Sequence, residues 1–234
     1  MHTGTTCSLH GVAYRERVIA DWRTCQGVGR SIPQQSGLWS RVIGNPGAAP
    51  ATGGTSVARV LPLHMAPLGR QHRHHPLFRR ARHIALYLPN DGEIDPRLLL
   101  RAAQRRGKAT YLPVLNPWPR TRMVFQRIEP GERLRRNRFG IFEPVIRTAR
   151  QRRVWALDLL LMPLVGFDGN GGRLGMGGGF YDRSLAYRAR RKKSHKPTLL
   201  GLAHECQRVD RLPLESWDVP LLGTVTDRGW YVER

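Results

Sequence analysis

Short continuous runs of apolar residues are the main pattern in the carboxyl-terminal two thirds of the chain. Four such runs predict strands, at residues 83–88, 110–115, 159–162 and 198–203. Short apolar runs bounded by turn residues are typical of strands buried on both faces of a largely parallel sheet. Weaker patterns predict three more strands, at 123–125, 222–226 and 230–232.

A helical pattern separates the first two predicted strands. Asp95 is a favourable N-cap residue and Pro96 suits the first helical position. One face of this helix should carry Leu98, Leu99, Ala102 and Ala103, and Gly107 should end the helix. Strand, helix and strand then form a β-α-β unit with a right-handed crossover.

The predicted strand at 159–162 leads into a segment with eight glycines within residues 166–179. A helical pattern follows from Phe180 to about residue 191. Glycine tolerates positive φ and lets backbone N–H groups approach an anion, and a helix N-terminus favours the same charge. The order of parts suggests a phosphate cradle, although a glycine-rich loop is as often a plain flexible connection. Neither G-x-x-x-x-G-K-[ST] nor G-x-G-x-x-G occurs here.

Polar residues near this segment favour the phosphate interpretation. Arg173 and Asp182 place a cation and a candidate metal ligand on either side of the glycines. Glu93 follows the first predicted strand, at the edge where open α/β sheets bind ligands. A single loop carboxylate is more often a surface residue, however. His204, at the end of another strand, is more typical of a structural residue that makes hydrogen bonds.

Residues 1–75 differ from the rest of the chain. They contain only two acidic residues, Glu16 and Asp21, and no periodic pattern apart from a weak one at 14–22. We expect an atypical, poorly ordered segment here and one α/β domain at 76–234. The basic run at 70–75 is interpreted as a solvated linker rather than a metal or nucleic-acid site.

The whole chain has 39 basic and 17 acidic residues, which give a formal net charge of +22. Only four of the basic residues are Lys, so the charge reflects a general preference for Arg. Such a charge attracts polyanions, but the arginine-rich stretch at 147–155 is more typical of a solvated face than of nucleic-acid contact.

Three widely spaced cysteines, Cys7, Cys25 and Cys206, indicate neither a disulfide framework nor a metal knuckle. With no run of eighteen apolar residues and no secretion signal at the start, we expect a soluble protein of a reducing cytoplasm.

Five motifs in order resemble the 5-formyltetrahydrofolate cyclo-ligase family, also called 5,10-methenyltetrahydrofolate synthetase. They are PNDGEID at 89–95, GKATYLPVL at 107–115, NRFGIFEP at 137–144, LLLMPLVGFDGNGGRLGMGGGFYDR at 159–183 and WDVPLLGTVTD at 217–227. The resemblance implies a three-layer α/β/α sandwich with a mixed, largely parallel sheet. It also implies ATP- and Mg²⁺-dependent cyclisation of 5-formyltetrahydrofolate to 5,10-methenyltetrahydrofolate, with ADP and phosphate released after phosphorylation of the formyl oxygen.

The resemblance also assigns roles to residues of this chain. Arg173 and Asp182 are the expected catalytic residues, and Asp182 and Asp218 the expected magnesium ligands. ATP is expected to contact Arg173, Leu174, Gly175, Met176, Gly177, Gly178, Gly179, Phe180 and Tyr181. The folate is expected to contact Leu88, Glu93, Gly177, Gly178, Gly179 and Phe180.

One departure from the family concerns the start of the chain. Family members begin with a basic amphipathic helix that reaches the ATP phosphates, and residues 1–75 show no such helix and no Lys. One hypothesis is that this segment is not the family's own, through a wrong start or a shifted reading frame. Two other readings remain open: a basic nucleic-acid-binding protein, and a family member that is inactive because this helix is lost. For the favoured reading we expect a monomer with no membrane partner and no specific nucleic acid.

Overall fold

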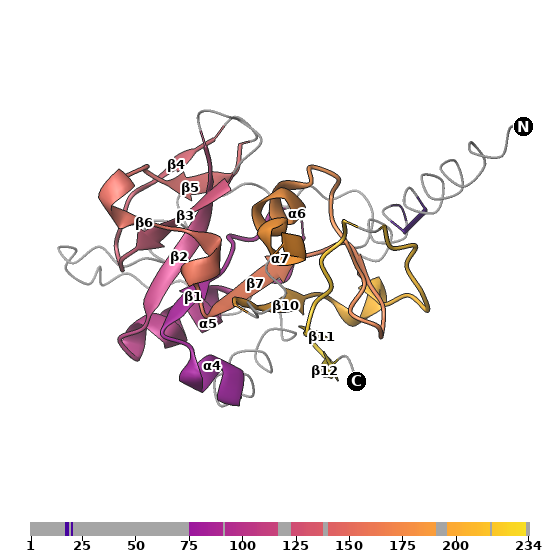
Figure 1. The fold of residues 1–234 in the computed structure, drawn as a ribbon. Coiled ribbons are helices and arrows are strands. Elements are labelled where there is room, and N and C mark those ends of the chain that lie inside the picture. The colour runs from indigo at the N-terminus through magenta and orange to yellow at the C-terminus, as the bar shows by residue number, and fades with distance from the viewer. Residues whose placement is uncertain are drawn as a thin grey trace, which may run out of the picture.

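The computed structural model describes residues 17, 18, 20, 75–90, 92–116, 123–137, 140–190, 196–215 and 217–232. One mixed sheet of eight strands dominates this part of the chain, in the order β12-β11-β10-β7-β1-β2-β3-β6 (Figure 1). Its strands are β1 (His83–Ala85), β2 (Ala109–Leu115), β3 (Met123–Ile128), β6 (Gln151–Arg152), β7 (Leu159–Pro163), β10 (Thr198–Leu202), β11 (Gly223–Val225) and β12 (Trp230–Val232).

The five central strands, β11, β10, β7, β1 and β2, are parallel to one another. The outer strands β12, β3 and β6 pair antiparallel. Two small hairpins stand apart from the main sheet: β4 (Leu134–Arg136) with β5 (Phe142–Pro144), and β8 (Gly166–Phe167) with β9 (Arg173–Leu174). The parallel arrangement brings the carboxyl ends of β1, β7 and β10 to one edge, where the candidate site lies.

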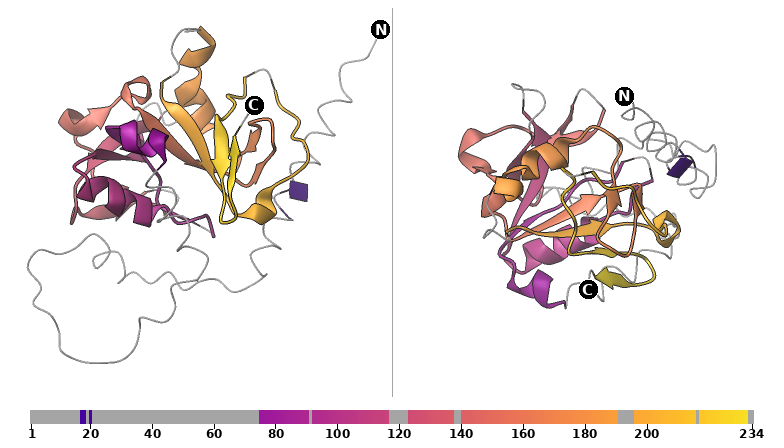
Figure 2. Two further views of the ribbon diagram at one scale, coloured as in Figure 1. Left: turned by 90° about the horizontal axis from the view of Figure 1, so that it is seen from below. Right: turned by 45° about the vertical axis from the view of Figure 1, so that its right-hand side comes forward.

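Helices cover both faces of the sheet (Figures 1 and 2). On one face lie α4 (Pro76–Arg80) and α5 (Arg97–Arg105), and on the other lie α6 (Phe180–Leu185), α7 (Tyr187–Arg190) and the short helix η4 (Val154–Ala156). Two further short helices are η3 (Thr148–Arg150) and η5 (Glu205–Gln207). The expected three-layer α/β/α sandwich with a largely parallel sheet is therefore confirmed.

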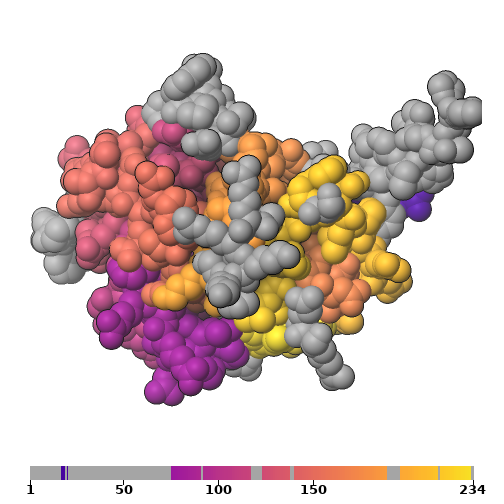
Figure 3. All heavy atoms as spheres, viewed as in Figure 1, coloured from indigo at the N-terminus to yellow at the C-terminus, as the bar shows by residue number. Residues whose placement is uncertain are grey.

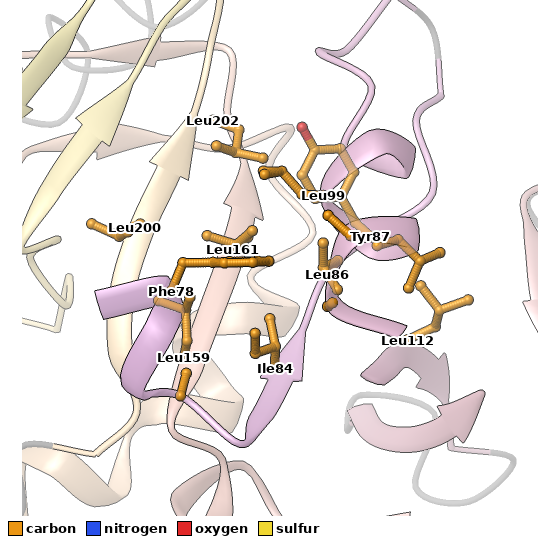
Figure 4. Close-up of a cluster of buried hydrophobic side chains, with 14 of the residues drawn as sticks. Phe78, Ile84, Leu86, Tyr87, Leu99, Leu112, Leu159, Leu161, Leu200 and Leu202 are labelled. Carbon is orange, nitrogen blue, oxygen red and sulfur yellow. The ribbon is translucent and has the colours of Figure 1, made fainter. Parts of the chain in front are cut away.

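Two hydrophobic clusters, one on each face, hold the layers together. Alternate residues of β7 divide between them: Leu159 and Leu161 face the α4 and α5 layer, and Leu160 and Met162 face the opposite one. Figure 4 shows the first cluster, where Phe78 of α4 lies over the side chains of β1, β7 and β10. Because both faces of the central strands are buried, these strands carry continuous apolar runs rather than alternating ones.

Several local predictions differ from the structure. Helix α5 begins at Arg97, with Pro96 in the N-cap position, although Asp95 Oδ1 still accepts a hydrogen bond from the Arg97 N–H at 2.8 Å. Leu98 is 41 % exposed, and Leu100 is buried in its place beside Leu99. The helix expected after the glycines is divided into α6 and α7, and neither small hairpin was predicted.

Most of residues 1–74 lie outside the described part of the chain, so their expected disorder and the boundary at residue 75 remain predictions. The exceptions are Arg17, Val18 and Ala20, which are helical and fall within the weak periodic pattern noted above. Val18 is buried, and its Cγ1 lies 2.7 Å from the position of a Cβ added to Gly166 of β8. This helical turn therefore packs against the β8–β9 hairpin, which forms the first half of the glycine-rich segment.

Cys206 is exposed and disulfide-bonded, which differs from the expectation of unpaired cysteines. The other two cysteines lie outside the described residues. Sequence spacing could not reveal this bond, because a disulfide depends on the spatial approach of two Cα atoms. None of the described helices is long and apolar enough to cross a membrane.

Candidate active site

The glycine-rich segment is more ordered than a flexible connection. Asp168, which is buried, organises the turn of the β8–β9 hairpin: its Oδ1 accepts hydrogen bonds from the N–H groups of Asn170 and Gly172 at 2.9 and 2.8 Å. Its Oδ2 accepts from the Leu212 N–H at 2.8 Å. A Cβ at Gly172 would lie 2.6 Å from this carboxylate, so only glycine fits there. The first half of the segment therefore builds a fixed hairpin that presents Arg173.

The second half, residues 175–179, needs glycine for two different reasons. Gly177 and Gly179 have φ values of +98° and +58°, in the left-handed region that side chains disfavour. Gly178 has no such φ, but a Cβ there would lie 2.8 Å from the Phe180 ring. Gly179 is also the N-cap residue of α6. The local backbone of this loop thus depends on glycine, and its ligand-binding role stays a prediction.

Arg173 and Asp182, which the sequence places on either side of the glycines, are in contact in the fold. Arg173 Nη2 forms an ion pair with Asp182 Oδ1, and the Arg173 side chain is only 7 % exposed. Its Nε is buried and has no hydrogen-bond partner among the described residues. Buried donors almost always have a partner, because leaving one unpaired costs about 1–3 kcal/mol. An anion bound at the glycines would supply the missing acceptor.

Glu93 lies in the loop between β1 and α5, close enough to affect two tyrosines. Burial and then the negative charge of Glu93 raise the pKa of Tyr181, and the same two causes raise the pKa of Tyr87 well above its usual value. Both phenols are therefore neutral at physiological pH. Tyr87 donates to the Ile94 carbonyl at 2.6 Å. The structure thus brings Glu93 and Tyr181, which are 88 positions apart, to one edge of the sheet.

Asp218 lies in the loop before β11, which is tied to the glycine segment. The Leu221 N–H donates to the Gly171 carbonyl at 2.9 Å, and in Figure 3 the yellow carboxyl-terminal segment adjoins orange residues of this region. Asp218 Oδ2 accepts a hydrogen bond from the Glu215 N–H at 2.9 Å. Within the described ranges, no group of three or more His, Cys, Asp or Glu side chains is arranged to hold a metal ion. Any metal bound by Asp182 or Asp218 would need other ligands as well.

The remaining predicted residues occupy different environments. Leu88 is only 8 % exposed and belongs to the core cluster with Tyr87 and Ile94. Phe180 is half-buried, with the Arg183 guanidinium 5.1 Å from its ring centroid. Leu174 lies in β9, and its carbonyl accepts from the Val165 N–H at 2.8 Å, whereas Met176 is exposed.

Sequence reasoning missed several polar residues that shape this edge. Asp168 was overlooked, although an Asp before Gly and Asn is a recognisable turn signal. Glu143 is buried and accepts hydrogen bonds from Arg135 and Asn137, each at 3.3 Å. These two hydrogen bonds stabilise the β4–β5 hairpin. No local signal identifies Glu143, because its partners come together only in the folded hairpin.

The fold and the site define an α/β protein whose glycine loop and buried arginine are suited to an anionic ligand at the carboxyl edge of a parallel sheet. The family model described as "5-formyltetrahydrofolate cyclo-ligase family" matches residues 67–227. The chain belongs to this family, and it is therefore an enzyme, a ligase. The resemblance stated from five motifs is confirmed.

Similar proteins support the assignment. The chain is 46 % identical to the 5-formyltetrahydrofolate cyclo-ligase of Haemophilus influenzae over 143 residues. This matched region covers 61 % of this chain and 74 % of that protein. The enzyme of the same name from Escherichia coli K12 is 43 % identical over 143 residues, or 61 % of this chain and 76 % of that protein.

A solved structure has the same fold. The NMR structure of Aquifex aeolicus 5,10-methenyltetrahydrofolate synthetase matches with a TM-score of 0.64 and 24 % sequence identity, covering 96 % of this chain and 93 % of that chain.

Proposed function

We propose that this protein catalyses the ATP- and Mg²⁺-dependent cyclisation of 5-formyltetrahydrofolate to 5,10-methenyltetrahydrofolate, with release of ADP and phosphate. Family membership supports the reaction type. The observation that carries the site is the buried Arg173, whose Nε lacks a partner beside a loop of glycines. A guanidinium donates in a planar fork that suits phosphate oxygens, so the unused donor matches a nucleotide phosphate.

ATP would bind along residues 173–181 in this proposal. Gly177, Gly178 and Gly179 leave the backbone open, so their N–H groups can approach phosphate oxygens without a Cβ in the way. Arg173 neutralises phosphate charge, and Asp182 holds the guanidinium in place through their ion pair. Phosphoryl transfer depends mainly on such positioning and charge stabilisation.

Asp182 and Asp218 would hold Mg²⁺ together with the phosphates of ATP. Magnesium in nucleotide sites is often bound by one or two carboxylates, with water and substrate phosphates completing the shell. Carboxylate oxygens are the hard donors that this ion prefers, although the described residues form no larger ligand cluster. When bound, Mg²⁺ neutralises charge that develops on the transferred phosphoryl group.

The folate would bind at the opposite side of the glycines, toward Glu93. A carboxylate there accepts hydrogen bonds from the N–H groups of the pterin, and neutral Tyr181 supplies a donor or a stacking surface. Phe180 and Leu88 would form apolar walls, with Leu88 contributing from the core cluster.

The chemistry then proceeds in two steps. The formyl oxygen attacks the γ-phosphorus and ADP leaves, which turns the formyl group into a good electrophile. The folate N10 attacks the activated carbon, the N10 proton is lost, and the carbon–oxygen bond breaks to release phosphate. The protein contributes by aligning the two reactants and by excluding water from the activated carbon.

We also propose that the protein acts as a cytoplasmic monomer without a membrane partner and without a specific nucleic-acid partner. The absence of a membrane-crossing helix among the described residues supports the membrane part of this proposal. The disulfide of Cys206 weighs against a reducing compartment, since thiols there are mostly kept free.

One assay tests the proposal: the protein is incubated with 5-formyltetrahydrofolate, ATP and Mg²⁺, and the near-ultraviolet absorbance of the methenyl product is followed. We expect product only when all three components are present. Folate binding without turnover would instead support an inactive family member. Salt-sensitive nucleic-acid binding with no folate binding would support the nucleic-acid reading.

A further inference from the structure

His204 connects two loops that lie 112 positions apart in the sequence. It follows β10, and its Nε2 lies 3.2 Å from the carbonyl oxygen of Gly92 in the loop after β1. A carbonyl oxygen only accepts hydrogen bonds, so the Nε2 of His204 must carry the proton and donate. The contact therefore joins the carboxyl ends of β1 and β10 at the edge that carries the site.

His204 itself stands on a rigid platform. Its backbone N–H donates to Gln207 Oε1 at 2.6 Å, and the buried Gln207 donates through Nε2 to the Leu164 carbonyl at 2.6 Å. The next residue, Glu205, accepts hydrogen bonds from the Tyr231 hydroxyl at 2.6 Å and from Thr226 Oγ1 at 2.8 Å. These contacts tie His204 to the residues that follow β7 and β11 and to β12.

The loop that His204 contacts is held on both sides of Glu93. On one side, the Gly92 carbonyl accepts from His204, and Gly92 has a φ of +75° that favours glycine. On the other side, the Ile94 carbonyl accepts from the buried Tyr87 hydroxyl at 2.6 Å. Glu93 is therefore the one residue between two anchored carbonyl groups, and its own Oε2 accepts from the Asn90 N–H at 3.1 Å.

We propose that His204 is a positioning residue for Glu93: by donating to the Gly92 carbonyl, it fixes the direction in which the Glu93 carboxylate faces the folate. This inference rests on the folate-binding role of Glu93 proposed above. His204 contributes through Glu93 and not through ATP, since its Nε2 contacts the β1–α5 loop that carries Glu93. Its loss should therefore weaken folate binding without affecting ATP binding.

Two amide substitutions separate this role from general stability. His204→Gln places a donor near the position of Nε2, whereas the shorter side chain in His204→Asn cannot reach the Gly92 carbonyl. We expect His204→Asn to raise the KM for 5-formyltetrahydrofolate about tenfold, as the loss of one hydrogen bond allows, with an unchanged KM for ATP. His204→Gln should restore most of the affinity. An equal rise in both KM values, or no rescue by Gln, would overturn the inference.

His83→Asn is the matched control, because His83 is also half-buried but begins β1, away from the carboxyl edge. It should leave the KM for folate unchanged. Glu93→Gln and the double variant Glu93→Gln with His204→Asn complete the design. If Glu93→Gln leaves the folate KM unchanged, the proposed role of Glu93 fails. If Glu93→Gln raises it but the effect of His204→Asn persists in full in the double variant, His204 does not act through Glu93 and only the present inference fails.

Discussion

At the scale of single residues, the site depends on a guanidinium that is buried before any ligand arrives. Within the described part of the chain, Arg173 has one ion-pair partner, Asp182, and one buried donor without a partner. A Lys at this position would carry the same charge on a flexible stem, but it would lose both the planar fork and the Nε donor. The arrangement therefore requires Arg specifically.

Arg173→Lys tests this requirement. We expect kcat/KM for ATP to fall by about tenfold or more, because the proposed bidentate contact to phosphate is replaced by a point charge. The KM for 5-formyltetrahydrofolate should stay close to the wild-type value. Steady-state kinetics with each substrate varied in turn gives both numbers, and Arg101→Lys on the exposed side of α5 serves as the control. Wild-type kinetics for ATP in Arg173→Lys would remove Arg173 from the nucleotide site.

Asp182→Asn should affect both activity and stability. The substitution removes a proposed magnesium ligand, so we expect turnover to fall by about a hundredfold or more. It also leaves the buried Arg173 charge without its counterion, so the free energy of unfolding should decrease by about 2 kcal/mol. Urea denaturation and the absorbance assay measure the two effects separately. Asp210→Asn, at an exposed position, should change neither; full activity in Asp182→Asn would contradict its proposed role.

At the scale of elements, the sequence predicted seven of the eight strands of the main sheet, because the central strands are buried on both faces and carry apolar runs. The strand predicted at 83–88 ends earlier, at Ala85 of β1, and β6 was not predicted. The runs at 110–115 and 159–162 differ from β2 and β7 by one residue at one end. The β8–β9 hairpin was not predicted because its strands have only two residues each and lie among glycines. The sequence placed Arg173 and Asp182 on either side of the glycines, but it did not predict that they form an ion pair.

Long-range contacts at the site could not be predicted. The contact of His204 with Gly92 and that of Leu221 with Gly171 join loops that no local pattern relates. The first contact exists because parallel strands place the carboxyl ends of β1 and β10 at one edge. The second joins the loop before β11 to the β8–β9 hairpin. The sequence does not state which strands or loops are neighbours. The roles of Glu93 and Asp218 came from family resemblance, and the structure adds the loops that hold them.

Asp158 joins the amino ends of three neighbouring strands. Its Oδ2 accepts hydrogen bonds from the N–H of Arg82, just before β1, at 2.9 Å, and from the N–H of His83, the first residue of β1, at 3.0 Å. Its Oδ1 accepts from Lys196, near the start of β10, at 2.7 Å. Burial alone would raise the pKa of Asp158, but the hydrogen bonds from Lys196, His83 and Arg82 outweigh it and lower the pKa to about 2.

This lowered pKa predicts how stability depends on pH. Because the carboxylate is favoured in the folded state, its contribution is fully present above the unfolded pKa of 3.8 and is lost as the pH falls toward 2. The contribution amounts to roughly 2 kcal/mol. Asp158→Asn should therefore lower the free energy of unfolding by about that amount at pH 7, and its difference from wild type should shrink between pH 4 and pH 2.

Urea denaturation at several pH values measures the dependence for Asp158→Asn. Asp210→Asn is again the control, because that residue is exposed and the substitution removes the same charge. A difference between Asp158→Asn and wild type that stays constant down to pH 2 would show that hydrogen-bond geometry, and not ionisation of Asp158, stabilises this edge.

At the scale of the whole molecule, the charge of +22 is much larger than the site requires. A chain with 39 basic and 17 acidic residues attracts any polyanion, including the anionic substrates proposed here. Attraction of this kind comes from the general field and depends on ionic strength, whereas the site uses buried groups that salt screens much less. The two contributions can therefore be separated by salt.

We expect the protein to bind labelled single-stranded oligonucleotides at low salt without regard to their sequence. If six or more phosphates are contacted, affinity should fall by about a few hundredfold or more between about 50 mM and 200 mM salt, because bound counterions are released. Fluorescence anisotropy with two unrelated sequences measures this, and cyclisation activity at both salt concentrations is the control, since the buried Arg173 should keep most of its effect. A preference for one sequence that survives the higher salt would contradict this expectation and would favour a specific nucleic-acid function.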